Sequence, residues 1–334
     1  RAPQMGGAFI QLYDCVFRGN YGNTIIGRGS DGEAYNSIIV SNCVFDANKV
    51  PAMSCGGKVS DCIFTNNVAA SWDGIVNAAL LLAVNNSFFY GNESLRGGCT
   101  YGGNIRATNC QFINNKSADS KVSYDYGGGA AYNGIYSNCL FRGNYIRTSN
   151  RSWYGGAIRG GRAVGCVFDG NRAGDGGATY GTMTINCLFT NNTASTLGSA
   201  AYGGSHTNSF YVNNKYTGSN TSGGILYGGV FDGCAFSENS SARYLGYNSK
   251  MENSLIVSNT ITASGYSIAA NGIYVNSTIT GNKTVNKAAI TGGTYTNTIV
   301  IANDNSQADV GGGTHIHTLY NTFTGTPLFS VLNL

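Results

Sequence analysis

Charged side chains gather in the middle of the chain, where their types would suit acid–base chemistry. Proton transfer to or from a polymer needs carboxylates, or a basic Lys or Arg, that converge on one exposed face. Alignment of the Gly-Gly-Ala segments places Asp175 in register with Tyr154. Trp153 and Tyr126 fall one position further back, so the region predicts a sugar-binding platform of aromatic rings beside arginine; the alternative is a solvated rim. The charged residues are Asp125, Arg142, Arg147, Arg151, Arg159, Arg162, Asp169, Arg172 and Asp175.

A row of mostly aromatic residues returns at intervals of 20 to 27 residues. Side chains that recur once per unit of a stacked repeat protein lie above one another, so these rings are expected to stack. An exposed row would suit carbohydrate or a partner surface, whereas a buried row would only stabilise the stack. Alternation does not decide between the two, because Thr179, Ala201 and Leu226 can face inward instead. The row consists of Tyr132, Arg159, Tyr180, Tyr202, Tyr227 and Tyr247.

The sequence contains few residues that could bind a metal ion or a cofactor. The chain has three histidines, of which His315 and His317 share one face of a strand, but no third ligand stands nearby. His206 falls at an apolar position of the repeat and predicts a core histidine. The ten cysteines include no Cys-x-x-Cys pair. The sequence therefore predicts no metal site and no cofactor.

Most cysteines belong to a repeated phrase of small residue, any residue, bulky residue and, five positions after the small one, Asn. The phrase occurs thirteen times with steps of 19 to 29 residues, about 24 on average. A period of this length is typical of solenoids. Cysteine alternates at this position with Ser and Thr, which predicts a small buried thiol. A disulfide such as Cys43–Cys62 remains an alternative. The small residues, called anchors below, are Cys15, Cys43, Cys62, Ser87, Cys110, Cys139, Cys166, Cys187, Ser209, Cys234, Ser254, Ser277 and Thr298.

The asparagine of the phrase is invariant within the chain. Asn tolerates left-handed backbone, and its amide can bond the amide of the next coil, so the lane predicts a hydrogen-bonded ladder in the turn after a strand. The lane consists of Asn20, Asn48, Asn67, Asn92, Asn115, Asn144, Asn171, Asn192, Asn214, Asn239, Asn259, Asn282 and Asn303.

Two more inward lanes accompany the anchor. One lies nine residues before it, contains Tyr101 and Ala130 and often follows Gly-Gly; the other lies three before it and is mostly apolar. Three short strands per coil, 49 glycines and no sustained 3.6-residue period predict an all-β fold. We expect a single right-handed parallel β-helix over residues 1–334, with about 13–14 coils.

These lanes resemble those of right-handed parallel β-helix proteins, the pectate-lyase-like superfamily. The recurring Phe-x-x-Asn, as in Phe141 to Asn144, together with Gly-Gly-Ala resembles more narrowly the repeats of chlamydial polymorphic membrane proteins, which are autotransporter passengers. The resemblance covers nearly the whole chain and implies a bacterial protein outside the cell or on its surface. It specifies function weakly, because lyases, adhesins and phage spikes share the scaffold.

Composition narrows the partners. Twenty Lys and Arg against sixteen Asp and Glu give a net charge of +4, too weak and scattered for a nucleic-acid groove. No apolar run is long enough to span a membrane. Gly6-Gly7-Ala8 and the segment from Asn321 to Leu334 both resemble coils, which suggests head-to-tail stacking with another copy.

The sequence thus favours an extracellular or cell-surface rod with a structural or adhesive role; a filament subunit and contact with carbohydrate or a host surface are forms that this role can take. Low charge and short loops argue against catalysis. The competing prediction is a carbohydrate-active enzyme, a polysaccharide lyase or hydrolase, or a carbohydrate-binding module. The sequence identifies neither the ligand nor the oligomeric state.

Overall fold

The computed structural model describes residues 9–22, 24–27, 38–69, 74–77, 81–117, 127–146, 154–304 and 309–320. The chain has two compact units, Arg1–Gly174 and Asp175–Leu334. All regular structure in the described ranges is strand, which confirms the all-β prediction, and every pairing is parallel. The single domain over residues 1–334 stays a prediction.

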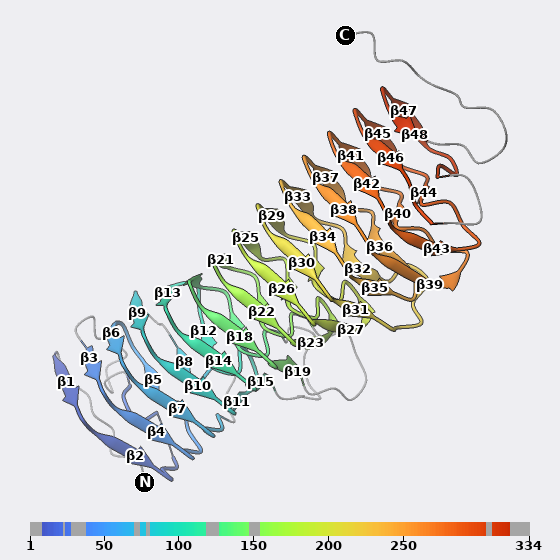
Figure 1. Cartoon of the computed structure of the whole chain (residues 1–334). Coiled ribbons are helices and arrows are strands. Elements are labelled where there is room, and N and C mark those ends of the chain that lie inside the picture. The colour runs from blue at the N-terminus through green and yellow to red at the C-terminus, as the bar shows by residue number, and fades with distance from the viewer. Residues whose placement is uncertain are drawn as a thin grey trace. The chain divides into compact units, whose positions relative to one another are not determined.

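The coils contribute short strands to four parallel sheets, called A to D here, which contain 11, 14, 14 and 9 strands (Figure 1). In the first unit, sheet B contains β1 (Ile10–Tyr13), β3 (Ile38–Ser41), β6 (Gly57–Ser60), β9 (Leu82–Asn85), β13 (Ile105–Thr108), β17 (Ile135–Ser137) and β21 (Arg162–Val164). Sheet C contains β2 (Val16–Arg18), β4 (Val44–Asp46), β7 (Ile63–Thr65), β10 (Phe88–Tyr90), β14 (Gln111–Ile113), β18 (Leu140–Arg142) and β22 (Val167–Asp169). Sheet D contains β11 (Glu93–Ser94), β15 (Lys116–Ser117), β19 (Tyr145–Ile146) and β23 (Arg172–Asp175). Sheet A contains β5 (Met53–Ser54), β8 (Val76–Asn77), β12 (Thr100–Tyr101), β16 (Ala131–Tyr132) and β20 (Ile158–Arg159).

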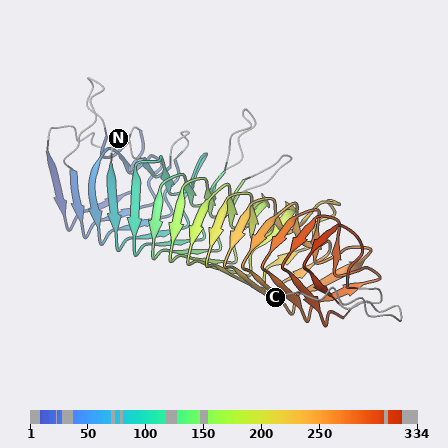
Figure 2. The ribbon, with the colours of Figure 1, turned by 90° about the horizontal axis from the view of Figure 1, so that it is seen from above.

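The second unit repeats this arrangement, with its strands stacked side by side (Figure 2). Its sheet B contains β25 (Met183–Ile185), β29 (Ser205–Thr207), β33 (Val230–Asp232), β37 (Lys250–Glu252), β41 (Ile273–Val275), β45 (Thr294–Thr296) and β47 (Thr314–Ile316). Sheet C contains β26 (Leu188–Thr190), β30 (Phe210–Val212), β34 (Ala235–Ser237), β38 (Leu255–Val257), β42 (Thr278–Thr280), β46 (Ile299–Ile301) and β48 (Leu319–Tyr320). Sheet D contains β27 (Thr193–Leu197), β31 (Lys215–Tyr216), β35 (Ser240–Ser241), β39 (Thr260–Ser264) and β43 (Lys283–Val285). Sheet A contains β24 (Thr179–Tyr180), β28 (Ala201–Tyr202), β32 (Gly224–Tyr227), β36 (Tyr244–Tyr247), β40 (Ala269–Ala270) and β44 (Ile290–Thr291).

Five turns of the first unit and six of the second carry a sheet A strand. The structure is therefore a parallel β-solenoid with 11 such turns. The prediction was about 13–14 coils with three strands each. Sheets B and C each contain 14 strands, which agrees with that number; sheet A contains 11, and Gly6 and Ala34, its expected positions in the first two coils, lie outside the described residues. In nine coils the structure also adds a strand that was not predicted, in sheet D, directly after the asparagine lane.

The core consists of the predicted inward lanes. Within the first unit, the bulky residues two after the anchor stack ring on ring, with centroids 4.7 Å apart for Phe112 and Phe141 and 5.2 Å for Phe141 and Phe168. The rings are buried from Phe45 onward. All ten cysteines are free thiols, and only Cys15 is more than slightly exposed. Burial raises the pKa of Cys62 and of Cys234 to about 11, so both thiols stay protonated.

One lane assignment was wrong. Tyr101 was expected to point inward with Ala130, but it pairs in register with Tyr132, and Thr100 pairs with Ala131. Thr100 and Ala131 are buried, whereas Tyr101 is half-buried. Tyr101 lies nine residues before Cys110, whereas its partner Tyr132 lies seven before Cys139, so two extra residues between the sheet A strand and Cys110 place Tyr101, and not a buried residue, nine before the anchor.

Candidate functional site

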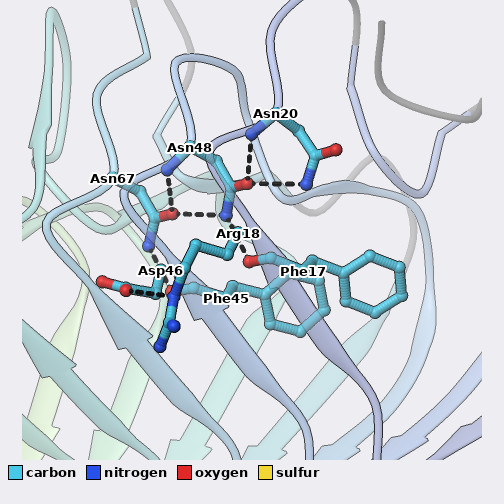
Figure 3. Close-up of polar contacts among 7 residues, drawn as sticks. All are labelled: Phe17, Arg18, Asn20, Phe45, Asp46, Asn48 and Asn67. Carbon is cyan, nitrogen blue, oxygen red and sulfur yellow. Dashed lines mark hydrogen bonds and ion pairs between the residues drawn. The ribbon is translucent and has the colours of Figure 1, made fainter.

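The thirteen lane asparagines lie just inside the corner between sheets C and D and bond along the solenoid in each unit. Asn20 Nδ2 donates to Asn48 Oδ1 at 2.9 Å, and Asn48 Nδ2 donates to Asn67 Oδ1 at 2.8 Å (Figure 3). Each Oδ1 also accepts the backbone N–H of the preceding asparagine, as in Asn20 N to Asn48 Oδ1 at 2.9 Å. The second Nδ2 hydrogen reaches a core carbonyl, Phe17 O at 3.0 Å for Asn48. These amides are saturated by the protein itself, so the lane offers nothing to a ligand.

The backbone role expected of this lane was wrong. The left-handed residue is the one before each lane asparagine, such as Gly143 at φ 61° or Asn191 at φ 56°. A second left-handed corner precedes each anchor, as at Asn138 with φ 52°. The lane asparagine keeps ordinary backbone because its side chain must turn inward to reach the next amide, while small or short polar residues beside it make the bend.

The recurring tyrosines face outward from sheet A of the second unit. Their ring centroids lie 4.6 Å apart for Tyr180 and Tyr202, 4.9 Å for Tyr202 and Tyr227, and 6.0 Å for Tyr227 and Tyr247. All four are half-exposed, whereas the residues before them, Thr179, Ala201, Leu226 and Gly246, are buried. The sequence left open whether the tyrosines or the residues before them face outward, and in the structure the tyrosine rings do. We call Tyr180, Tyr202, Tyr227 and Tyr247 the tyrosine strip.

The two remaining predicted members, Tyr132 and Arg159, lie on sheet A of the first unit. The Arg159 guanidinium carbon lies 5.2 Å from the Tyr132 ring centroid and 4.9 Å from that of Tyr154. Tyr101 joins them, with its ring centroid 5.2 Å from that of Tyr132. Cation–π contacts of this kind hold Arg159 against aromatic surface and leave it less available to a ligand than a lone arginine.

Sequence reasoning missed a cluster beside the strip, formed by Arg243, Tyr244 and Tyr266. The Tyr244 ring centroid lies 5.0 Å from that of Tyr247 and 5.2 Å from that of Tyr266. The Arg243 guanidinium carbon lies 4.4 Å from the Tyr266 ring centroid, and its Nη2 donates to Ser219 O at 3.3 Å. Arg243 Nε is buried, with no hydrogen-bond partner in the described ranges. Arg243 and Tyr266 each stand eleven residues before an anchor, Ser254 and Ser277, but the other coils carry different side-chain types there, so no row of like residues marks them.

Asp175 is the one predicted catalytic candidate with unusual electrostatics. Its side chain is 5% exposed, it accepts a hydrogen bond from the Leu197 backbone N–H, and Oδ1 has no partner among the described residues. Burial raises the pKa of Asp175 to about 6, and the hydrogen bond opposes that rise. Burial raises the pKa of Tyr216. The charge of Arg243 lowers it, and the charge of Asp175 raises it.

The raised pKa of Asp175 predicts a stability effect. Since the folded state holds the proton more tightly than the unfolded chain, the cost of ionising Asp175 is absent below pH 4 and complete above pH 6. The shift from 3.8 to about 6 corresponds to up to about 3 kcal/mol of lost unfolding free energy. Urea titrations at pH 4 and pH 8 measure the unfolding free energies of the wild type and of Asp175→Asn. From pH 4 to pH 8, the variant should gain stability relative to the wild type by this amount. An unchanged difference would contradict the buried carboxyl.

The other predicted charges do not form one site in the described residues. Arg142 Nε donates to Asp169 Oδ2 at 2.8 Å in an exposed ion pair, and the Arg172 guanidinium carbon lies 5.7 Å from the Tyr145 ring centroid. Arg162 is exposed. Asp125, Tyr126, Arg147, Arg151 and Trp153 lie outside the described residues, so the platform predicted around them stays a prediction.

The histidines are structural. His206 is buried, its Nδ1 lies 2.7 Å from Thr184 Oγ1, and its ring stacks on Phe231 at 4.6 Å. Burial lowers the pKa of His206 to about 4. The expected His315–His317 face was wrong, because the strand ends at Ile316 and His317 occupies the left-handed corner. Across the described ranges, no group of three or more His, Cys, Asp and Glu is placed to hold a metal ion.

The chain matches no protein-family model and no curated protein. Among solved structures it is similar to a mannuronic acid specific polysaccharide family 6 lyase enzyme from human gut microbiota. That similarity covers 93% of this chain and 78% of the other at 10% identity, with a TM-score of 0.34. At this TM-score it bears on neither fold nor function. No helix in the described part of the chain is long and apolar enough to cross a membrane.

Proposed function

We propose that the protein binds an extended polysaccharide along the tyrosine strip of the second unit. The observation that carries the proposal is the half-exposed row of Tyr180, Tyr202, Tyr227 and Tyr247, stacked at centroid distances of 4.6 to 6.0 Å. A linear polymer laid along the row meets one phenol per coil, about every 4.8 Å. The ligand therefore has to be a repeating chain and not a single small molecule.

The chemistry of the strip favours a hydroxyl-rich ligand. Because the rings stack on one another, they present edges and hydroxyl groups to solvent, and phenol combines apolar contact with hydrogen bonding. The strip itself carries no charged side chain, and Arg243 adds one cationic edge beside Tyr266. Neutral sugars match such a surface better than a strongly acidic or basic polymer, which would leave most of its charges without partners.

Affinity electrophoresis in gels that contain neutral or acidic polysaccharides tests the proposal. We expect retardation of the wild type in at least one neutral polysaccharide. Tyr202→Ala and Tyr227→Ala should each weaken that retardation about tenfold, because each removes one ring from the middle of the contact.

Tyr90→Ala is the matched control, since Tyr90 is 40% exposed and belongs to sheet C of the first unit, not to sheet A, which carries the strip. Binding should survive this substitution. Equal losses in all three variants, or no retardation of the wild type in any polysaccharide, would contradict the proposal.

Asp175 supports a second candidate, cleavage of the bound polymer. A carboxyl with a pKa of about 6 suits general acid catalysis, and Asp175 stands five residues before Tyr180. We nevertheless expect no turnover, since the second carboxylate that a hydrolase of the usual kind pairs with the first is not evident beside Asp175 in the described residues. Reducing-end and unsaturated-product assays check this. Cleavage that falls above pH 6 and disappears in Asp175→Asn would establish the enzyme.

The wider setting belongs to the same proposal. A solenoid with a polysaccharide-binding strip suits an extracellular or cell-surface rod with an adhesive role. Head-to-tail assembly into a filament depends on residues 1–8 and 321–334, which lie outside the described ranges. Electron microscopy of the concentrated protein tests the filament, and fields without fibres would exclude it.

A further inference from the structure

A row of thiols lies at the corner between sheets B and C of the first unit. Cys15, Cys43 and Cys62 occupy the anchor position of three successive coils, and all three are free thiols. The strands that follow the first two pair in register, Val16 with Val44, so Cys15 and Cys43 stack directly on each other. Such neighbours lie about 4.8 Å apart, within the range of roughly 4.4–6.8 Å that a disulfide allows between Cα atoms.

The sulfur of Cys43 lies against the coil that carries Cys15. It accepts a hydrogen bond from the Cys15 backbone N–H at 3.4 Å, and it lies 3.7 Å from Leu12 O of the same coil. The two side chains also interact: burial raises the pKa of Cys43, and the Cys15 thiol is among the further groups that raise it. The Cys43 sulfur is therefore placed beside the side chain of Cys15.

Exposure and freedom to move distinguish this pair from the other stacked cysteines. Cys15 is half-exposed, whereas a second row, Cys110, Cys139 and Cys166, is buried. Among the described residues β1 and β2 are the end strands of sheets B and C, so the coil of Cys15 is paired on one side only. The Cβ atoms of a disulfide lie about 3.8 Å apart, closer than the stack spacing, and an end coil closes that difference more readily than a coil paired on both sides.

We infer that Cys15 and Cys43 form a disulfide between coils by exchange with a small-molecule disulfide. The Cys15 thiolate attacks one sulfur of that molecule, whose S–S bond breaks; one half leaves as a thiolate and the other stays bonded to Cys15. Cys43 then loses its proton, and its sulfur attacks Cys15 Sγ and displaces the second half. The two cysteines together lose two protons and two electrons, and the small molecule is reduced to two thiols.

The bond ties an end coil to its neighbour. Cys15 and Cys43 are 28 residues apart in the chain. A crosslink across such a segment stabilises mainly by restricting the unfolded chain, so the end coil separates less readily from the stack. The stability of this coil then depends on whether its surroundings supply a disulfide or a thiol. The inference goes beyond the proposed function, because the tyrosine strip belongs to the second unit.

Mass spectrometry of the full chain after incubation with oxidised glutathione tests the inference. The product should be lighter by two hydrogen atoms, and digestion without reductant should yield a peptide that joins Cys15 to Cys43. Its first urea transition should move to higher urea and return when a thiol is added. Cys15→Ser should abolish the change in mass. Cys62→Ser is the matched control, because Cys62 is the other neighbour of Cys43 in the row and its loss should leave the oxidation unchanged.

Both variants place serine where the chain itself has serine at the anchor Ser87, so equal circular dichroism spectra are expected. Cys234 is an internal control, since its stacked neighbours are Ser209 and Ser254 and it should stay reduced. An unchanged mass, a glutathione adduct that persists on Cys15, or a crosslink between other cysteines would overturn the inference. A disulfide-linked dimer, or oxidation of Cys15→Ser at the wild-type rate, would overturn it as well.

Discussion

Replacing Phe141 by alanine is expected to lower the unfolding free energy by about 3–5 kcal/mol. Phe141 is buried, its ring centroid lies 4.7 Å from that of Phe112 and 5.2 Å from that of Phe168, and Tyr136 meets its edge at 5.3 Å. The stack cannot close the gap, because each neighbouring ring is fixed by its own strand. Urea denaturation followed by circular dichroism measures the loss.

Leu140→Ala is the control in the same strand, since Leu140 faces outward and is half-buried. It should cost less than half as much. Because a solenoid can unfold in parts, the first transition of a biphasic curve is the one to compare. Equal costs for both variants would mean that the Phe lane does not form the core.

Replacing Asn144 by aspartate should be equally damaging at neutral pH, about 3–5 kcal/mol. Asn144 Nδ2 donates to Phe112 O at 2.8 Å and to Asn171 Oδ1 at 3.0 Å. A carboxylate keeps the Asn115 N–H donors on one oxygen but turns its other oxygen toward two acceptors with no proton to donate, so the buried charge is only partly compensated. The pKa of the introduced carboxyl would be raised by burial and by these acceptors.

The sign of the pH dependence follows from that raised pKa. The folded variant holds a proton that the unfolded chain releases near pH 4, so its stability falls as pH rises above that value and recovers in acid. Thermal unfolding of wild type and Asn144→Asp at pH 4 and pH 8 measures this. Asn138→Asp is the control, because Asn138 is exposed at the neighbouring corner of the same coil. A pH-independent loss, or none, would contradict the amide ladder.

The fold was predictable because the same sequence pattern recurs in every coil. Phe17 to Asn20 and twelve later copies fix the inward lanes through strand alternation, and one wrong coil does not disturb the rest. Prediction failed where coil length varied, as at Tyr101, since register counted from the anchor shifts with each insertion. It also failed at backbone detail: the left-handed turn was assigned to the lane asparagine because Asn tolerates it, whereas the residue before it, five times Gly and four times Asn, has the positive φ.

The candidate site was only half predictable. Tyr180, Tyr202, Tyr227 and Tyr247 repeat with the coil and were found, but their outward direction needed the burial of Thr179 and its equivalents. Arg243 and Tyr266 each stand eleven residues before an anchor, Ser254 and Ser277, but the other coils do not repeat these side-chain types, so no row of like residues marked them.

Hydroxyl-radical footprinting of the protein, alone and with the polysaccharide that retards it most, tests the central claim most directly. The polymer should lower the oxidation rates of Tyr202 and Tyr227 severalfold and leave that of Tyr90 unchanged, because only the strip is covered. Protection confined to other residues, or equal rates with and without polymer, would contradict binding along the tyrosine strip.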